Sequence, residues 1–530
     1  MLNVPARSSG ADAVSVSFVK TTTPTVIDPV NIAQNDASIR WDSIDPRDNI
    51  STSGFFGSKN YINEHARVEF DVYASSIDLQ ILAFTAILDV LVDGKYVSTA
   101  SITNDASGAA MIMTLTWPTK KKRNIKIYGI NFGFAGVYIS KASRISAPNY
   151  ARRPLVFVLG DSYTQGTGAQ SLARAWCNTL GALMGWDVIQ CGIGSTGWTS
   201  SSTNLPATRV SSDMQLRTHA PDRILCALGF NDNGGNMPLL QSQFVTAIDA
   251  IKAAFPAAVI QVIGPWTPLG ETGALAVVKR RLIAACAGEG VAFGDISAII
   301  TAGNSATFGL GDSVHPNDLG HRFIGQQIAG VPFSVPSPAA AFNPSDKTTT
   351  VTLSTGNLLA TVTSNTGDPQ VRSVGSRSSG KGYFEIQLNP AGTWGGAIGL
   401  SASGHAFTTY LGGDASSVGV WLSVSNTFVV VNNITVYNAG PGMTTNAGDV
   451  WGIAVDMTAK KMWFRNSTAA TLWNNDAGAD PVAGTNGIDI SSISGALFIT
   501  VENDTTGDSV RINTPSAAYE NSPPSGYSDF

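Results

Sequence analysis

Four apolar runs between residues 155 and 263 constrain the fold of this chain more than any other feature. They are Leu155–Leu159, Val188–Cys191, Ile224–Leu228 and Val259–Ile263, and segments with helical patterns separate them. Between the last two runs, Phe244, Ile248, Ile251 and Phe255 recur at a spacing that places them on one helix face. Strands that alternate with helices are typical of a parallel sheet covered by helices. We therefore predict a three-layer α/β/α domain over residues 151–335.

The sequence before residue 150 has a different pattern of apolar and polar residues, which favours an antiparallel β-sandwich. Short apolar or alternating runs, including Val68–Val72, Ile87–Val92 and Ile125–Ile130, are separated by turn residues such as Asp93-Gly94. Such runs bounded by turn residues are typical of short strands. We predict a jelly-roll-like sandwich over residues 1–150, followed by a polar linker at Lys141–Pro154.

The last third of the chain is strand-like again, after a Pro/Ala/Ser-rich second linker at Val331–Pro344. The candidate strands are Tyr383–Leu388, Ala397–Leu400, Val418–Leu422, Val450–Asp456, Lys461–Phe464 and Ala496–Val501. Three stretches, Gly382–Glu385, Gly448–Asp456 and Lys461–Phe464, resemble sequences of the SPRY/concanavalin-like lectin sandwich. The resemblance implies a lectin-like β-sandwich over residues 345–530.

Charge content and hydropathy exclude some classes of function. Only 13% of the residues are charged, against about 25% in an average soluble protein, and the formal net charge is -5. A nucleic-acid partner is not expected, because the only basic run, Lys120–Arg123, is interpreted as a solvated turn. No apolar stretch is long enough for a membrane helix, and Met1–Lys20 lacks the pattern of a signal peptide. The composition favours an extracellular or virion-associated protein.

The four cysteines are predicted to be small buried side chains. Cys177, Cys191, Cys226 and Cys286 all lie in the middle third, within strand-like and helical segments. Their spacing is not that of a metal site, and the flanking β-rich regions contain no cysteine that could build a disulfide framework. We therefore predict no structural disulfide and no metal.

The strongest chemical signal is a serine at the end of the first apolar run. Leu155–Leu159 leads directly into Gly160-Asp161-Ser162 before a helical segment. The carboxyl end of a parallel strand is where open α/β sheets bind their ligands. A Gly-Asp-Ser triplet alone is weak, because a helix-capping serine would give the same pattern.

Two further motifs strengthen the functional interpretation. Gly229-Phe-Asn231-Asp follows the run Ile224–Leu228, and Asp312-Ser-Val-His315 precedes the last helical segment. Together with the Gly-Asp-Ser triplet, these motifs resemble three of the four blocks of the SGNH (GDSL-like) hydrolases, in the same order. The resemblance implies a serine esterase whose catalytic triad is Ser162, His315 and Asp312.

The second block of that family departs from its usual pattern here. In Cys191-Gly-Ile-Gly194-Ser195-Thr-Gly, the position of the family's oxyanion glycine falls on Gly194 or Ser195. A backbone N–H serves equally from either residue, and Gly194 is slightly favoured because close approach to substrate favours glycine. The predicted oxyanion hole therefore combines the N–H of Ser162, the N–H of Gly194 or Ser195 and the side-chain amide of Asn231.

The triad implies acyl transfer without a cofactor. His315 would accept the proton of the Ser162 hydroxyl, and Asp312 would fix the tautomer of the imidazole and stabilise its cation. Trp198 and Trp266 follow predicted strand ends, where their rings could stack on sugar or simply pack. We list them as candidate substrate-binding residues.

The β-rich flanking regions resemble modules that accompany carbohydrate O-acetylesterases, as well as modules of phage tail proteins. The expected reaction is O-deacetylation of an acetylated polysaccharide, which is then the expected partner; homo-oligomer formation stays open. Two alternatives remain at this point. One is a lipid or thioester hydrolase of the same superfamily, and the other is an adhesion protein with a silent hydrolase domain.

Overall fold

The computed structural model describes residues 15–19, 23–33, 36–42, 56–57, 65–98, 102–103, 110–148, 153–200, 204–216, 219–267, 271, 273–336, 340–390, 394–423, 426–440, 443, 445–513 and 518–530. The chain forms two compact units, each drawn from several segments. The first comprises Met1–Asn231, Asp249–Thr272 and Gly294–Pro332. The second comprises Asp232–Ile248, Gly273–Phe293 and Phe333–Phe530. The domain boundaries expected from the sequence remain a prediction.

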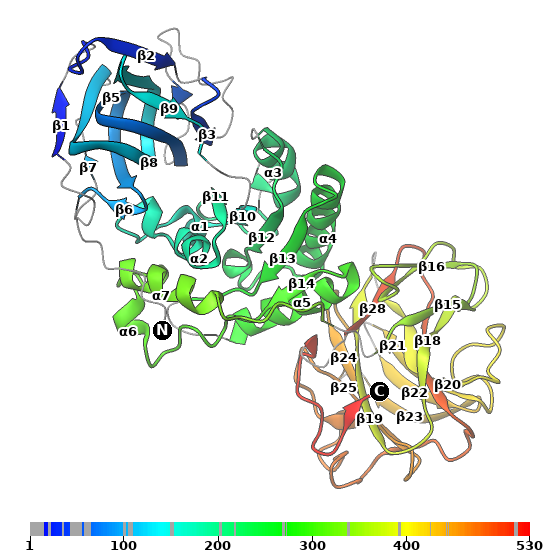
Figure 1. Cartoon of the computed structure of the whole chain (residues 1–530). Coiled ribbons are helices and arrows are strands. Elements are labelled where there is room, and N and C mark those ends of the chain that lie inside the picture. The colour runs from blue at the N-terminus through cyan, green and yellow to red at the C-terminus, as the bar shows by residue number, and fades with distance from the viewer. Residues whose placement is uncertain are drawn as a thin grey trace. The chain divides into compact units, whose positions relative to one another are not determined.

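The N-terminal part of the first unit is an antiparallel β-structure, drawn in blue to cyan in Figure 1. Its strands are β1 (Ser15–Val19), β2 (Pro29–Ala33), β3 (Arg40–Asp42), β4 (Phe56–Gly57), β5 (His65–Val92), β6 (Lys95–Tyr96), β7 (Ile102–Thr103), β8 (Ala110–Ser140) and β9 (Arg144–Ser146). The apolar side chains of β5 and β8, Val68 and Ile127 among them, form its buried core.

Two long strands, β5 and β8, replace the shorter strands expected from the sequence. Two segments of β8 pair with the middle of β5, so that Leu79 of β5 lies opposite both Met113 and Val137 of β8. The predicted turn at Asp93-Gly94 is present, because both residues have positive φ (51° and 75°) and join β5 to β6 through two residues.

Two predictions about polar segments were wrong. The basic run Lys120–Arg123 is part of β8 rather than a turn, and Arg123 is buried with its guanidinium 4.7 Å from the ring of Trp117. The expected linker Lys141–Pro154 contains β9, which pairs with β5. Neither segment has an apolar periodicity, so their strand conformation depends on tertiary contacts.

The middle of the chain forms the predicted sheet, whose strand order is β11-β10-β12-β13-β14. The strands are β10 (Leu155–Gly160), β11 (Asp187–Gly192), β12 (Arg223–Ala227), β13 (Val259–Ile263) and β14 (Ala292–Gly294). The pairs β10–β11, β10–β12 and β12–β13 are parallel. This parallel sheet with its helices confirms the α/β fold class.

Helices connect these strands and follow them. They are α1 (Ser162–Gln165), η1 (Leu172–Arg174), α2 (Trp176–Met184), α3 (Pro206–Ser212), η3 (Met214–Leu216), η4 (Phe230–Asp232), α4 (Met237–Ala254), α5 (Gly273–Glu289), α6 (Ser305–Phe308) and α7 (Asp318–Ile328). The four cysteines are buried, as the sequence predicts. No helix among the described residues is both long and apolar enough to cross a membrane.

The second unit contains the predicted C-terminal β-sandwich. One sheet has the order β15-β18-β27-β20-β21-β22-β23, and the other has β16-β17-β28-β19-β24-β25-β26, with β29 beside β19. The bounds are β15 (Phe342–Lys347), β16 (Val351–Ser354), β17 (Leu359–Val362), β18 (Gln370–Arg377), β19 (Lys381–Asn389), β20 (Gly395–Ala402), β21 (Ser417–Ser423), β22 (Thr427–Val431), β23 (Ile434–Gly440), β24 (Val450–Asp456), β25 (Lys461–Asn466), η5 (Trp473–Asn475), β26 (Ile488–Asp489), β27 (Leu497–Asn503), β28 (Ser509–Asn513) and β29 (Ser528–Asp529).

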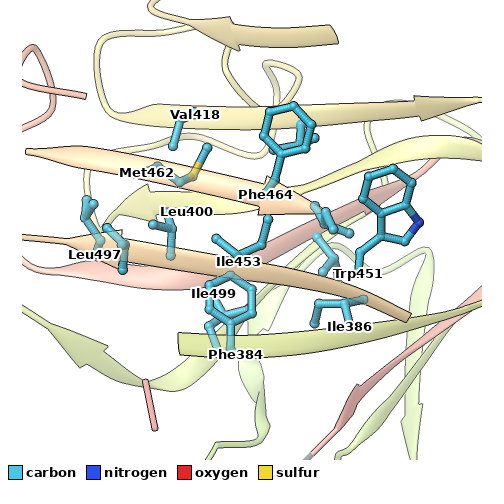
Figure 2. Packing of buried hydrophobic residues seen from close by; sticks show 14 of the residues in the cluster. Phe384, Ile386, Leu400, Val418, Trp451, Ile453, Met462, Phe464, Leu497 and Ile499 are labelled. Atoms are coloured by element: carbon cyan, nitrogen blue, oxygen red, sulfur yellow. The ribbon is translucent and has the colours of Figure 1, made fainter. Parts of the chain in front are cut away.

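The core of this sandwich lies between its two sheets. Figure 2 shows Ile453 and Phe464 from one sheet packed with Leu400 and Ile499 from the other. All four are buried. Trp451, Ile453 and Val455 of β24 all belong to this core, so every second residue of the strand faces the other sheet.

Candidate active site

Three of the sequence motifs meet at the carboxyl edge of the parallel sheet. In the register of the sheet, Gly160 at the end of β10 lies opposite Gly192 of β11 and Ala227 of β12. Ser162 follows β10 within two residues, and Asn231 follows β12 within four. The topology therefore brings together side chains that are far apart in sequence.

Ser162, His315 and Asp312 form a continuous chain of hydrogen bonds. The Nε2 atom of His315 lies 2.9 Å from Oγ of Ser162, and its Nδ1 atom lies 2.6 Å from Oδ2 of Asp312. When Nδ1–H donates to the carboxylate, Nε2 is left to accept the serine proton. This geometry is that of an activated serine nucleophile.

The carboxylate of Asp312 is held in its ionised form. Its Oδ1 atom accepts hydrogen bonds from the backbone N–H groups of Val314 (2.9 Å) and His315 (2.8 Å). The slight burial of the carboxyl raises its pKa, but the hydrogen bonds from the side chain and backbone of His315 and from Val314 lower the pKa more, to about 2. Asp312 is thus an anion at any pH at which the imidazole could act as a base.

An aromatic cluster supports the histidine from the nucleophile turn. The ring of Tyr163 packs edge-on against His315 at 5.6 Å and stacks on Trp266 at 4.1 Å, measured between ring centroids. The hydroxyl of Tyr163 donates to the carbonyl oxygen of Val314. Tyr163, which follows the nucleophile, is therefore hydrogen-bonded to Val314, which precedes His315.

The loop that contains Gly194 and Ser195, the predicted oxyanion donors, lies beside Ser162. A Cβ atom added to Gly194 would lie 3.8 Å from Cβ of Ser162 and 2.9 Å from Oε1 of Gln165, so the backbone approaches closely here. Ser195 has a left-handed backbone (φ 59°) and an exposed side chain. The amide nitrogen of Asn231 donates to the carbonyl oxygen of Thr196 at 2.8 Å, which leaves its second hydrogen for another acceptor.

A buried arginine that the sequence analysis missed holds this block in place. Arg209 in α3 donates from Nη1 to the carbonyl oxygen of Gly160 (3.1 Å) and to Oγ1 of Thr196 (3.3 Å), and from Nη2 to the carbonyl oxygen of Cys191. Its side chain is buried, and this burial lowers its pKa. Arg209 thus connects the ends of β10 and β11 with the loop that contains Gly194. No motif marks this residue, because its partners come together only in the folded chain.

The structure corrects the prediction for the two tryptophans. Trp198 is fully buried, and Trp266 is 7% exposed with its ring stacked on Tyr163. Neither ring offers an exposed face on which a sugar could stack. Among the described residues, no group of three metal-ligating side chains could hold a metal ion.

Comparison with known proteins gives a family for this part of the chain. Residues 158–323 match the GDSL-like Lipase/Acylhydrolase family. No curated protein matches the chain in sequence.

Solved structures similar to the chain share little sequence with it. A family two carbohydrate esterase from Clostridium thermocellum in complex with cellohexaose is 14% identical, with 55% of this chain and 97% of that chain covered and a TM-score of 0.44. The salicylyl-acyltransferase SsfX3 from a tetracycline biosynthetic pathway is 15% identical, with coverages of 57% and 95% and a TM-score of 0.46. The TRIM65 PSpry domain is 16% identical, with coverages of 33% and 90% and a TM-score of 0.27.

The matched residues contain the whole hydrogen-bonded chain from Ser162 through His315 to Asp312. Residues 158–323 therefore match the GDSL-like Lipase/Acylhydrolase family, and this part of the chain has the hydrogen-bonded serine, histidine and aspartate of an ester hydrolase.

Proposed function

We propose that Ser162 is the nucleophile of a serine esterase that removes O-acetyl groups from a polysaccharide. The observation that carries the catalytic part is the chain of hydrogen bonds Ser162–His315–Asp312, at 2.9 and 2.6 Å. His315 takes the serine proton as the hydroxyl attacks the ester carbonyl, and returns it to the leaving alcohol. Asp312, held ionised, stabilises the imidazolium that forms in between.

The carbonyl oxygen becomes negative during the attack and needs donors around it. We propose the backbone N–H of Ser162, the backbone N–H of Gly194 and the second amide hydrogen of Asn231. Gly194 is preferred to Ser195 because its backbone lies next to Ser162. Donors fixed before the reaction stabilise charge that develops only in the transition state, and each contributes about 3–4 kcal/mol. Water then hydrolyses the acyl-enzyme by the same route.

An open site supports a substrate in which the ester is attached to a polymer. The side chain of Asp312 is 41% exposed and that of His315 is 19% exposed, so the triad lies near the surface of the domain. An acetyl group on a long glycan can reach such a site without the glycan entering a deep pocket. The resemblance of the C-terminal sandwich to lectins supports the same class of substrate. The proposal includes action outside the cell or on a virion, as the low charge content predicts.

One observation favours a second candidate, a lipid or thioester hydrolase. Leu310 is 47% exposed and its backbone N–H donates to the carbonyl oxygen of His315, so an exposed apolar side chain lies beside the triad. An acyl chain could pack against it. The two candidates differ in the length of the acyl group that they accept.

Acetate release tests the proposal directly. The protein is incubated with acetylated xylan, acetylated pectin and acetylated bacterial polysaccharides, and in parallel with activated esters of two to twelve carbons; Ser162→Ala is the control. We expect acetate release from at least one glycan and a preference for the shortest ester. A preference for long acyl chains would support the second candidate, and inertness toward every ester would favour an adhesion protein with a silent domain.

A further inference from the structure

The nucleophile helix α1 keeps two of its side chains at the surface of the site. Tyr163 and Thr164 are buried, whereas Ser162 and Gln165 are half-buried. Residues three positions apart are neighbours on a helix surface, so Gln165 lies beside the nucleophile on the open side of α1. The triad and the proposed oxyanion donors use Ser162, but they leave Gln165 without a role.

The backbone of Gln165 is fixed by close packing against the end of β11. Its N–H donates to the carbonyl oxygen of Asp161 at 2.9 Å. A Cβ atom added to Gly192 would lie only 2.3 Å from the same nitrogen, so no side chain fits at that position of β11. The side chain of Gln165 therefore starts from a fixed point next to the loop that contains Gly194.

The side chain of Gln165 extends over Gly194. Its Oε1 atom lies 2.9 Å from the position that a Cβ atom would take on Gly194, and Cβ of Ser162 lies 3.8 Å from that same position. The reacting ester must lie between the hydroxyl of Ser162 and the N–H of Gly194 if that N–H is to bind the oxyanion. The carboxamide of Gln165 therefore borders the place of the ester.

The carboxamide of Gln165 has hydrogen-bonding groups to spare. A glutamine side chain offers two N–H hydrogens and a carbonyl oxygen with two lone pairs. None of these groups is hydrogen-bonded to another residue in the part of the chain that the structure describes. Because Gln165 is only half-buried, water can satisfy them in the free protein, and a substrate can take the place of that water.

The opposite side of the nucleophile is apolar. Successive residues of a helix are rotated by about 100°, so Tyr163 and Gln165 leave α1 in nearly opposite directions. The ring of Tyr163 contacts the rings of Phe230 and Trp266, at 5.4 and 4.1 Å between centroids, and Phe230 is half-buried. An apolar surface suits the methyl group of an acetyl ester, whereas a carboxamide suits the hydroxyl groups of the alcohol.

We propose that Gln165 is a specificity-determining residue that hydrogen-bonds a free hydroxyl group in the alcohol part of the ester. The inference rests on the proposed esterase function and narrows its substrate class. The preferred substrates are acetyl esters of polyols that keep a free hydroxyl group next to the acetylated oxygen, as in a partly acetylated sugar. Esters of simple alkyl alcohols leave the carboxamide without a partner and are poorer substrates.

Two acetates of similar size test this assignment. Acetylglycerol with one acetyl group carries two free hydroxyl groups, and propyl acetate has the same acyl group and the same number of alcohol carbons without them. We expect kcat/KM of the wild type to be about tenfold higher for acetylglycerol, as one or two hydrogen bonds between neutral groups would give. Gln165→Met keeps the length of the side chain without its hydrogen bonds, and it should bring the ratio of the two values close to one. A ratio that is unchanged in this variant would overturn the proposal.

A second variant tests the position of the side chain independently of the alcohol. Gln165→Glu places a carboxylate near the oxygen that becomes negative during the attack, so kcat should fall at least tenfold on both esters near neutral pH. A kcat equal to that of the wild type would show that the side chain does not border the ester. The matched control is Gln327→Met, an exposed glutamine in the last turn of α7, which should keep both rates. An equal change of the ratio in Gln327→Met would also overturn the proposal.

The wild-type protein separates this proposal from the proposed esterase function. Hydrolysis of both acetates with equal kcat/KM would refute the role of Gln165 and leave the esterase function intact. Inertness of the wild type toward both acetates and toward every activated ester would refute the esterase function itself, and the role of Gln165 with it. A preference for acetylglycerol that disappears in Gln165→Met would support the assignment.

Discussion

The hydroxyl of Tyr163 donates a hydrogen bond of 2.7 Å to the carbonyl oxygen of Val314, across 151 positions of sequence. It joins the residue that follows the nucleophile to the residue that precedes the catalytic histidine. The distance between Ser162 and His315 is therefore maintained by a contact that does not itself take part in the reaction.

Replacing Tyr163 by Phe should impair positioning without removing a catalytic group. We expect kcat to fall about tenfold with KM unchanged, and the free energy of unfolding to fall by about 1 kcal/mol. Steady-state kinetics on a small acetyl ester and urea denaturation measure the two effects. Tyr410→Phe, which loses a hydrogen bond to Asn433 elsewhere in the chain, is the control and should keep the wild-type kcat. An unchanged kcat in Tyr163→Phe would show that this bond does not position the histidine.

Replacing Ser162 by Ala should remove the nucleophile and leave the fold intact. We expect kcat to fall by about 10⁴–10⁶, with a melting temperature close to that of the wild type. A fluorophosphonate probe should label the wild type at Ser162 and leave the variant unlabelled. Activity near the wild-type rate in the variant would refute the proposed mechanism.

Replacing Asn231 by Ala should remove one oxyanion donor. We expect kcat to fall by about 10²–10³ with little change in KM, because the donor acts mainly when charge develops on the carbonyl oxygen. Asn233→Ala is the control, since that exposed residue lies two positions further along the same turn. A rise in KM alone would instead identify Asn231 as a residue that binds the ground state.

Glu502 should make the stability of the second unit depend on pH. Burial is the main reason that the pKa of Glu502 rises from 4.5 to about 8. The nearby carboxylates of Asp504 and Asp368 also raise this pKa, whereas the hydrogen bond from the N–H of Leu411 lowers it. Between pH 4.5 and 8 the folded state keeps a proton that the unfolded state has lost, so the free energy of unfolding falls as the pH rises, by at most about 1.4 kcal/mol per pH unit. Glu502→Gln has no carboxyl group that could bind a proton on folding. Denaturation across this range should show a flatter pH dependence in the variant, and an identical slope would contradict the assignment.

Glu520 should stabilise the second unit through Arg281 of α5. Their side chains are 2.8 Å apart, and that of Arg281 is only 2% exposed. Glu520→Gln removes the nearer of the two carboxylates, Glu520 and Glu385, that offset the charge of the buried guanidinium, and we expect a loss of about 3 kcal/mol in chemical denaturation. Arg280→Gln is the comparison, because Arg280 lies 3.4 Å from Glu520 and is 19% exposed. It should cost less than about 1 kcal/mol. Equal losses would show that burial of Arg281 is not the cause.

Continuous apolar runs allowed strands of the catalytic domain and of the C-terminal sandwich to be predicted. Leu155–Leu159 coincides with β10 but for one residue, and Val450–Asp456 coincides with β24. The continuity of β8 could not be predicted, because Lys120–Arg123 is polar and its strand conformation is supported by tertiary contacts, such as the pairing with β5 and the contact of Arg123 with Trp117. The residues next to Arg123 in the sequence do not indicate that it will contact Trp117.

The same distinction applies to the site. Ser162, Asn231, Asp312 and His315 were identifiable because each is a polar residue with a reactive or donor group in a short motif next to a strand or helix. Arg209 was not identifiable, since its acceptor at Gly160 lies 49 positions away and its role depends on tertiary packing. The burial of Trp198 was missed for the same reason, because a position after a strand end does not reveal the direction of the next turn.

The pairing of Arg281 with Glu520 also has a consequence for protein synthesis. The two residues are 239 positions apart, so at about 5–20 residues per second the ribosome delivers Glu520 roughly 12–48 seconds after Arg281. During that interval α5 carries a cation whose partner has not been made. A polypeptide that stops before residue 520 contains Ser162, Asp312 and His315 but lacks this partner of buried Arg281, so we expect its triad to be complete and its second unit to be less stable than in the longer chain.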